Sequence, residues 1–275
     1  MNPQTIAFVG GGNMAASLIG GLITAGRDPD SIQVADINPA RLEWLAEQFA
    51  VHTHPQARLA AAGAGTIVLA VKPDVIARAC RDLAAIAQAQ ASLVISIAAG
   101  IREPDIRRWL DYDAAIVRCM PNTPALLGAG ASALFANSLV TAGQRQQAQE
   151  IISACGSSLW VEQESQLDAV TALSGSGPAY YFLFMELMIR AGTALGLTTE
   201  TARRLTLQTA LGAARMALEA DVDPDILRQR VTSPGGTTER ALASFMDNGL
   251  DRLVLEAMTA ACDRAAQLGD ELGKD

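Results

Sequence analysis

The 275-residue chain has few aromatic residues and no long hydrophobic run. Aromatic side chains make up 4% of the sequence although 50% of it is hydrophobic, so its apolar content is mostly Ala, Leu, Val and Ile. The longest apolar stretch, around 91–101, is shorter than the roughly 20 residues that a membrane-spanning helix needs. Residues 1–4 carry no basic side chain ahead of the first apolar run, which is not typical of a secretory signal. We therefore expect neither a membrane span nor secretion.

Positive charge and metal-binding patterns are also scarce. Lys and Arg number 21 against 29 Asp and Glu, which leaves a net charge of −8, so a nucleic-acid partner is not expected. His52 and His54 lie in one expected loop without a nucleophile or zinc motif, and we interpret them as surface histidines. No spacing of Asp, Glu, His and Cys predicts a metal site. We interpret the cysteines as reduced, mostly buried side chains of a cytoplasmic protein. The cysteines are Cys80, Cys119, Cys155 and Cys262.

Up to about residue 160, short β-branched runs alternate with Ala-rich stretches that have helical periodicity. Several of the runs are apolar on both faces, which is typical of parallel strands covered by helices on both sides. The pattern predicts an α/β domain with a doubly wound parallel sheet. The expected strands are 6–9, 32–35, 66–69, 93–96 and 115–118.

After residue 161 the strand-like runs end, and the apolar residues recur with the spacing of amphipathic helices. We therefore predict an α/β domain over 1–161 and an all-helical domain over 162–275. Apolar runs at 181–185 and 205–207 are too hydrophobic for a solvated face, so we expect them in an obligate dimer interface. The long helical segments are 179–195, 200–219 and 252–272.

The first expected strand runs into a glycine motif that opens a helix. Gly10 permits a tight turn, Gly12 lets a pyrophosphate approach the backbone, and Ala15 keeps the helix close to the sheet. The helix N-terminus offers free N–H groups to the phosphates. A tight turn without a ligand is the alternative, but the strand–turn–helix context predicts a Rossmann-type dinucleotide site. The motif consists of Gly10, Gly11, Gly12, Asn13, Met14 and Ala15.

Asp36 stands at the end of the second expected strand. A carboxylate there normally accepts hydrogen bonds from the adenosine ribose and repels a 2′-phosphate, which favours NAD over NADP. Alternatively, Asp36 only starts the turn that ends at Pro39, a common role for Asp. Arg41 lies close enough in the sequence to meet a 2′-phosphate. The residues themselves therefore leave the choice between NADP and NAD open.

Three further expected strands end in segments suited to a ligand, because an α/β sheet binds its ligand at the carboxyl ends of its strands. The third strand is followed by Lys72, the only lysine besides Lys274, for which a solvated loop lysine is the alternative interpretation. The fourth and fifth strands lead into segments of small, hydroxyl and amide residues that include Ala99 and Asn122.

Two glycine-rich loops interrupt the helical half. The first, 174–180, is open to two interpretations, a helix start at Pro178 or contact with a ligand. The second, 233–238, offers successive backbone N–H groups at a helix N-terminus, an anion site suited to a substrate carboxylate. An ordinary capped turn is the alternative.

Together, these motifs resemble the pyrroline-5-carboxylate reductase family, whose members make L-proline in the last step of its biosynthesis. The motifs run in order through nearly the whole chain. The glycine motif is shared by many dehydrogenases, whereas the segment 120–124 and the two glycine-rich loops are specific. The segments that carry the resemblance are 8–14, 70–73, 96–100, 118–124, 168–171, 174–180 and 233–238.

The resemblance implies an oxidoreductase that transfers hydride from NAD(P)H to the C=N carbon of L-1-pyrroline-5-carboxylate. The cofactor would bind the Rossmann-type domain, and the helical domain would form a cytoplasmic homodimer or a higher homo-oligomer built from dimers. Family members commonly use NADP, but Asp36 departs from the small hydroxyl residue that many of them have, which leaves NAD as an alternative.

The resemblance also implies residue roles. Thr238 would be catalytic and hydrogen-bond the imine nitrogen, and Glu164 would be a further substrate-site residue. Because an imine arrives readily as an iminium, orientation suffices without a strong proton donor. The substrate would be held by Ser233, Gly235, Gly236 and Thr237 as well. The cofactor would be held by Gly10, Gly11, Gly12, Asn13, Met14, Asp36, Ala70, Val71, Lys72, Pro73, Ala99 and Asn122.

Two other functions fit the sequence less well. A β-hydroxyacid dehydrogenase shares the glycine motif and a helical second domain, but it relies on a lysine of that domain for proton transfer, and here the domain has only Lys274. A cofactor-binding protein without catalytic activity would not need both glycine-rich loops of the helical half.

Overall fold

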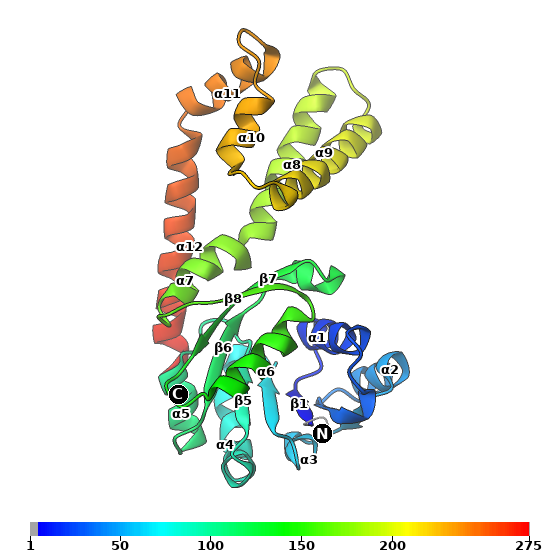
Figure 1. The fold of residues 1–275 in the computed structure, drawn as a ribbon, viewed down its shortest axis with the longest axis vertical. Helices are drawn as coiled ribbons and strands as arrows, with labels where there is room; N and C mark the ends of the chain where they lie inside the picture. The colour runs from blue at the N-terminus through cyan, green and yellow to red at the C-terminus, as the bar shows by residue number, and fades with distance from the viewer. Residues whose placement is uncertain (1–4, 275) are drawn as a thin grey trace. The chain divides into compact units, whose positions relative to one another are not determined.

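The structure is a computed structural model that describes residues 5–274 (Figure 1). These residues divide into two compact units. The first unit contains the residues up to Ser176 together with the stretch from Ala260 onward, and the second unit is Gly177–Thr259. Among the described helices, none combines the length and the apolar character that crossing a membrane requires.

The first unit is built on an eight-stranded sheet with the order β3-β2-β1-β4-β5-β6-β7-β8. Neighbouring strands are parallel except β6 and β7. The order reverses between β1 and β4, and open α/β sheets bind ligands at the carboxyl ends of strands beside such a switch point. The strands are β1 (Ile6–Val9), β2 (Ile32–Ala35), β3 (His52–His54), β4 (Thr66–Leu69), β5 (Leu93–Ser96), β6 (Ile116–Met120), β7 (Gly130–Ala136) and β8 (Gly156–Trp160).

Helices cover both faces of this sheet (Figure 1). The helical elements of the first unit, apart from the last part of α12, are α1 (Asn13–Thr24), η1 (Pro29–Ser31), α2 (Pro39–Phe49), α3 (Ala57–Ala61), α4 (Pro73–Gln90), α5 (Glu103–Leu110), η2 (Thr123–Leu127), α6 (Ala142–Ser153), α7 (Gln166–Val170) and the π-helical turn η3 (Thr171–Gly175). In β1, Ile6 and Phe8 enter the core formed with α1, α2 and α6, whereas Ala7 and Val9 enter the core formed with α3, α4 and α5. The predicted doubly wound α/β architecture is therefore confirmed.

The sequence predicts five of the eight strands. Four of them lie at the expected residues, and the fifth is Ile116–Met120 instead of 115–118. β7 and β8 are not predicted because they contain no β-branched residue, and β3 has only three residues. The prediction that His52 and His54 lie in a loop is wrong, because these two residues form the ends of β3. The ring Nε2 of His54 lies 2.7 Å from Oε1 of Gln33 on β2.

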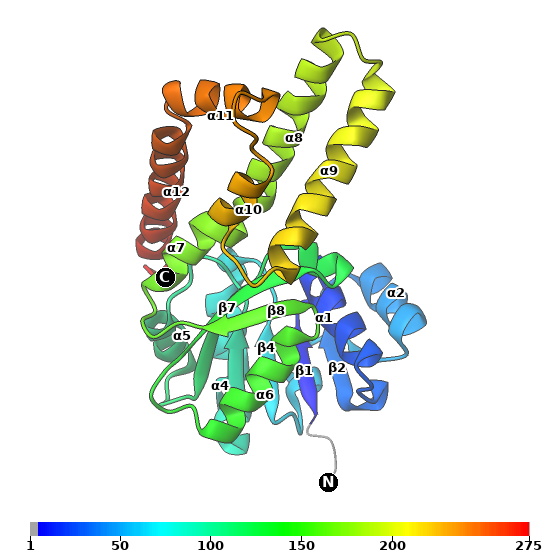
Figure 2. The same ribbon diagram turned by 45° about the horizontal axis from the view of Figure 1, so that its top comes forward.

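The second unit is helical and exposes large apolar side chains. Figure 2 shows its first two helices side by side. On the first of them, Tyr181 is 70% exposed and Phe182 is 65% exposed. Apolar surface of this extent is typical of a subunit interface. The helices are α8 (Gly177–Ala194), α9 (Thr199–Glu219), α10 (Pro224–Arg230), α11 (Thr237–Asp247) and the first part of α12 (Leu250–Leu272).

The first unit extends beyond the predicted boundary at 161/162. One reason is that α7 packs against β6 and β7, and that Nδ2 of Asn122 donates a hydrogen bond to the carbonyl oxygen of Ser174 (3.0 Å). The part of α12 from Ala260 onward also belongs to the first unit. Composition and periodicity do not reveal such a connection between distant segments.

The cysteines are free thiols, and three of them are buried. Burial raises the pKa of the Cys80 and Cys119 thiols to about 12 and the pKa of Cys155 to about 11. These three thiols therefore stay protonated and pack as small apolar groups, as predicted.

Candidate active site

The turn after β1 requires glycine at its first position. Gly10 has φ +102°, a conformation that side-chain-bearing residues rarely adopt. A Cβ atom at Gly10 would lie 2.6 Å from the carbonyl oxygen of Ala70 and 2.9 Å from Cγ1 of Val71. The N–H of Ala70 donates to the carbonyl oxygen of Val9 (2.8 Å). The structure thus brings together two segments that are predicted to hold the cofactor, the glycine motif and the residues after β4.

Gly12 is the N-cap of α1 and leaves the first turn of this helix open. Because glycine has no side chain, this N-cap cannot bond the first N–H groups of the helix. A Cβ atom at Gly12 would have no described atom within 4 Å. Gly12 and Asn13 are exposed, whereas Met14 is half-buried and packs against the core. An exposed helix N-terminus of this kind fits a pyrophosphate group.

The backbone N–H and C=O of Gly11 are hydrogen-bonded to two side chains of opposite charge, Asp36 and Arg41. The N–H of Gly11 donates to Oδ2 of Asp36 (2.7 Å), and the N–H of Asn38 donates to Oδ1 of the same carboxylate (2.9 Å). Nε of Arg41 donates to the carbonyl oxygen of Gly11, and the guanidinium carbon lies 4.2 Å from the ring centroid of Trp44. Asp36 therefore supports the glycine motif as well as starting a turn, and Arg41 lies beside the motif.

The residues after β4 and β5 reach the same edge of the sheet, because both strands run parallel to β1. Lys72 is exposed and is the N-cap of α4, which begins at Pro73. After β5, the N–H of Ile97 donates to the carbonyl oxygen of Leu69 (3.2 Å). Ala99 follows in an exposed position. The cofactor residues predicted after three different strands thus lie at neighbouring strand ends.

Asn122 is only 9% exposed and uses its amide group inside the protein. Its Oδ1 accepts a hydrogen bond from the N–H of Ala131 (2.9 Å), while its Nδ2 donates to Ser174. Close by, a Cβ atom at Gly175 would lie 2.5 Å from Cε of Met120. Asn122 therefore joins the end of β6 to β7 and to the π-helical turn, a role that the sequence does not predict. Its contact with the cofactor stays a prediction.

Glu164 lies in a cluster of charged residues beside β6. Its Oε1 accepts hydrogen bonds from Nη1 of Arg118 (2.8 Å) and from the N–H of Glu103 (2.5 Å). Burial raises the pKa of Asp168, and the charges of Arg118 and Arg102 oppose this effect. Of this cluster, only Glu164 is predicted to be a site residue, and that prediction comes from the resemblance. Its hydrogen-bond partners are 46 and 61 residues away along the chain, so the sequence does not indicate these contacts.

The predicted substrate loop at 233–238 belongs to the second unit and forms one turn at the N-terminus of α11. Gly236 is the N-cap, and its N–H donates to the carbonyl oxygen of Ser233 (3.0 Å). Gly235 has φ +72°, and its N–H donates to Oε2 of Glu239 (2.7 Å). The five residues predicted here to contact the substrate therefore share one turn, in which a carboxylate already accepts a backbone hydrogen bond.

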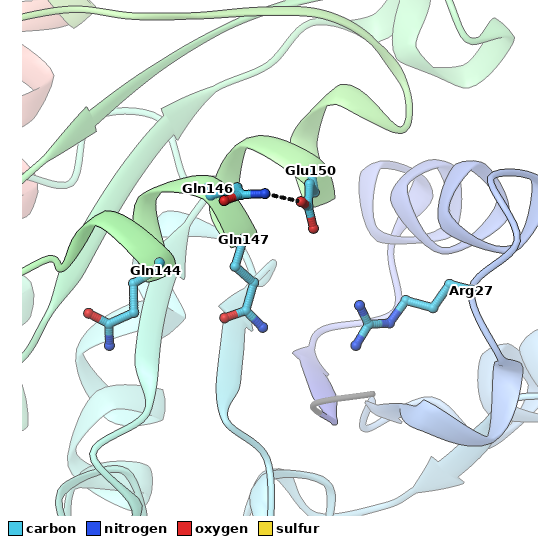
Figure 3. A pocket seen from close by; sticks show the side chains of 6 residues that line it. Arg27, Gln144, Gln146, Gln147 and Glu150 are labelled. Carbon is cyan, nitrogen blue, oxygen red and sulfur yellow. Dashed lines mark hydrogen bonds between the residues drawn. The ribbon is translucent and has the colours of Figure 1, made fainter. Parts of the chain in front are cut away.

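A separate polar pocket lies beyond the C-terminal end of α1 (Figure 3). Arg27 and the α6 residues Gln147 and Glu150 line it. Within it, Nε2 of Gln146 donates to Oε1 of Glu150 (3.0 Å). Because the glycine motif lies at the N-terminal end of α1, this pocket is distinct from the predicted cofactor site.

The chain matches two family models. Residues 164–268 match the model of pyrroline-5-carboxylate reductase dimerisation, and residues 5–100 match the model of NADP oxidoreductase, coenzyme F420-dependent. The two matched regions correspond to the helical half and to the first part of the α/β half.

The chain is also similar to known proteins over its whole length. The chain is 50% identical over 274 residues to pyrroline-5-carboxylate reductase of Pseudomonas aeruginosa, covering 100% of both chains. A pyrroline-5-carboxylate reductase structure from Coxiella burnetii superposes with a TM-score of 0.94 at 47% identity, covering 97% of this chain and 99% of that one. Plasmodium falciparum pyrroline carboxylate reductase with NADP bound has a TM-score of 0.84 at 28% identity, covering 98% and 99%. Similarity of this extent shows that the chain belongs to the pyrroline-5-carboxylate reductase family.

Proposed function

We propose that the protein reduces L-1-pyrroline-5-carboxylate to L-proline with NADPH, and with NADH as an alternative cofactor. The observation that carries this proposal is the full-length similarity to pyrroline-5-carboxylate reductases at 50% identity. The glycine turn of the first unit and the 233–238 turn of the second unit supply the two kinds of site that the reaction needs, one for a dinucleotide and one for a small carboxylate.

The residues of the glycine motif fit the cofactor. A Cβ atom at Gly12 would have no described neighbour within 4 Å, so a pyrophosphate can approach the N-terminus of α1. Gly10 to Met14 hold this group, and Asp36 faces the adenosine ribose. The segment 70–73 and Ala99 lie on the nicotinamide side, and Asn122 supports the same edge of the sheet. The reduced nicotinamide supplies the hydride.

The 233–238 turn binds the substrate in this proposal. Gly235, Gly236 and Thr237, with Ser233, hold its carboxylate at the positive end of α11. Thr238 hydrogen-bonds the imine nitrogen and so orients the C=N bond. An iminium carbon needs no further activation, and the contribution of the protein is therefore mainly proximity and orientation. The resemblance also implies a substrate contact for Glu164, but its carboxylate accepts hydrogen bonds from Arg118 and from the N–H of Glu103, so in this proposal it makes no direct contact with the substrate.

We infer a homodimer, or a higher homo-oligomer built from dimers, located in the cytoplasm. The dimerisation family model and the exposed Tyr181 and Phe182 of α8 support the dimer. The buried, protonated Cys80, Cys119 and Cys155 are consistent with a reducing compartment.

The test is a direct assay of the purified protein. NADPH and NADH oxidation are followed by absorbance with L-1-pyrroline-5-carboxylate, and a 3-hydroxy acid with the oxidised cofactors serves as the control substrate. We expect turnover that depends on the pyrroline and none with the hydroxy acid. Absence of pyrroline-dependent turnover with both cofactors would overturn the proposal.

A further inference from the structure

The loop that connects β5 to α5, residues 97–102, brings Ala99 to the carboxyl edge of the sheet. Ala99 is exposed, whereas Ile101 is fully buried. Gly100 has φ +73°, and a Cβ atom there would lie 3.1 Å from Cδ1 of Leu272 on α12. The loop therefore projects one small side chain from a support that α12 helps to form.

Arg102 ties the end of this loop to α12. Its Nη1 donates a hydrogen bond to Oδ1 of Asp270 (2.7 Å), and its Nη2 donates to the carbonyl oxygen of Ala266 (3.0 Å). The guanidinium group lies across Gly269, where a Cβ atom would be 2.7 Å from Nε of Arg102. The ion pair is partly exposed and weak by itself. Arg102 can approach α12 this closely only because residue 269 is a glycine, so the contact depends on that residue.

Glu164 binds the backbone of Glu103, the residue that follows Arg102. Its Oε1 accepts a hydrogen bond from the N–H of Glu103, the first residue of α5, at 2.5 Å. Arg102, the N-cap of α5, has no acceptor in its side chain, so the Glu164 carboxylate supplies the acceptor for the first N–H of this helix, in addition to the negative charges of Glu103 and Asp105 in its first turn. Nη1 of the buried Arg118 donates to the same Oε1 atom of Glu164 (2.8 Å). Nδ2 of Asn137 also donates to Oε1 of Glu103 (2.8 Å).

We propose that Arg102 and Glu164 are positioning residues that act through the 97–102 loop on the nicotinamide end of the cofactor. This inference rests on the proposed function and deepens it. Two consecutive residues, Arg102 and Glu103, are anchored to segments that are distant in sequence, so the place where the loop ends is determined by tertiary contacts. A misplacement of about 1 Å can lower the rate of a transfer step by about 100-fold. Glu164 accordingly supports the loop and does not bind the substrate.

Gly269→Ala tests the Arg102 contact. The new methyl group displaces the guanidinium tip, while alanine is a better helix former than glycine in the interior of α12. We expect a melting temperature no lower than that of the unchanged protein, a fall in kcat of about tenfold, and a larger primary isotope effect with NADPH deuterated at the transferred position. In the protein without cofactor, amide hydrogen exchange over 97–103 should accelerate.

Two variants are matched controls. Gly143→Ala makes the same change in the first turn of α6, where a Cβ atom has no described neighbour within 4 Å. Glu271→Gln removes an ion pair with Arg264 on α12 that is exposed (2.8 Å). Both controls should leave kcat, the isotope effect and the exchange of 97–103 unchanged.

Glu164→Gln and Glu164→Ala separate positioning from substrate binding. Glutamine keeps an acceptor for the Glu103 N–H, so we expect it to retain most of kcat and slow exchange over 97–103. Alanine should lower kcat by about tenfold and accelerate that exchange, with the KM for the pyrroline within about twofold. A substrate-binding Glu164 would instead raise the KM for the pyrroline in both variants without changing the exchange.

The outcomes distinguish this inference from the proposed function. If the unchanged protein does not reduce the pyrroline, the proposed function fails. If it does so but Gly269→Ala has the isotope effect and loop exchange of the Gly143→Ala control, the Arg102 role is overturned and the proposed function stands. If Glu164→Ala changes only the KM for the pyrroline, the Glu164 role is overturned in the same way.

Discussion

The helices α1 and α11 both have a glycine N-cap, but the glycine has a different role in each. At α1, a Cβ atom on Gly12 would have no described neighbour within 4 Å, whereas at α11 a Cβ atom on Gly236 would lie 2.9 Å from the carbonyl oxygen of Ser233. The turn at α1 is open, so its glycine leaves room for a ligand. The turn at α11 is closed on itself, so its glycine is required by the chain.

The two turns also differ in the carboxylate that each contains. Asp36, which accepts the N–H of Gly11, comes from the end of β2 and lies 25 residues away in the sequence. Glu239, which accepts the N–H of Gly235, lies four residues away on an exposed turn. The carboxylate at the α1 turn is thus held by the sheet, whereas the one at the α11 turn comes from the same short segment. If the α11 turn binds the substrate carboxylate as proposed, that carboxylate has to compete with Glu239 for the N–H of Gly235.

The largest effect is expected for Gly10→Ala. The methyl group would be forced into a positive φ and against the Ala70 carbonyl oxygen, which lies 2.6 Å from the Cβ position. We expect the free energy of unfolding to fall by about 3 kcal/mol in a denaturant titration. Gly12→Ala is the matched control: alanine is a poorer N-cap than glycine, so we expect a loss of about 1 kcal/mol or less, together with a higher KM for NADPH. Equal destabilisation by the two substitutions would contradict the assignment of Gly12 to a ligand.

Thr238→Ala tests the α11 turn. Loss of a hydrogen bond to the nitrogen of the iminium, which is cationic until hydride transfer neutralises it, should lower kcat/KM for the pyrroline by about 10–100-fold. The dissociation constant of NADPH, measured by fluorescence, should not change. Unaltered steady-state kinetics would remove Thr238 from the site.

Asp36→Ser addresses the cofactor preference. Removing the carboxylate relieves repulsion of a 2′-phosphate, so the ratio of kcat/KM for NADPH to that for NADH should rise by about tenfold, or about 1.4 kcal/mol. Because the Gly11 N–H loses its acceptor, the absolute affinities for both cofactors should fall. The ratio is therefore the decisive measurement, and an unchanged ratio would mean that Asp36 supports the turn without facing the ribose.

The smallest effect is expected for Glu239→Gln. Glutamine keeps an acceptor for the Gly235 N–H but removes the negative charge that competes with the substrate carboxylate. The KM for the pyrroline should fall by about twofold to threefold at low ionic strength, and the difference should shrink in high salt. A KM that rises instead would show that Glu239 stabilises the productive turn and does not compete for it.

Much of this arrangement is predictable from local sequence. Buried strands such as Ile6–Val9 are recognised in the sequence by their continuous apolar runs. The glycine motif is recognised because a tight turn needs glycine at fixed positions. The strand Gly156–Trp160 at the far edge of the sheet is not predictable in this way, because it has no β-branched residue and its residues alternate between half-buried and exposed. The charged support of the 97–102 loop is also hidden from the sequence, since Arg102 and Asp270 are separated by 168 residues.

The sequence by itself determined the doubly wound first half, the helical second half, the position of the dinucleotide turn and the family to which the chain belongs. These features depend on short-range patterns, namely periodicity, turn chemistry and motifs of a few adjacent residues. Only the tertiary structure decided that Asn122 and Glu164 use their polar atoms on other parts of the protein, and that Arg102 rests on α12 at Gly269. A polar side chain shows its chemistry in the sequence, but its partner is set by the packing of segments that fold together from distant parts of the chain.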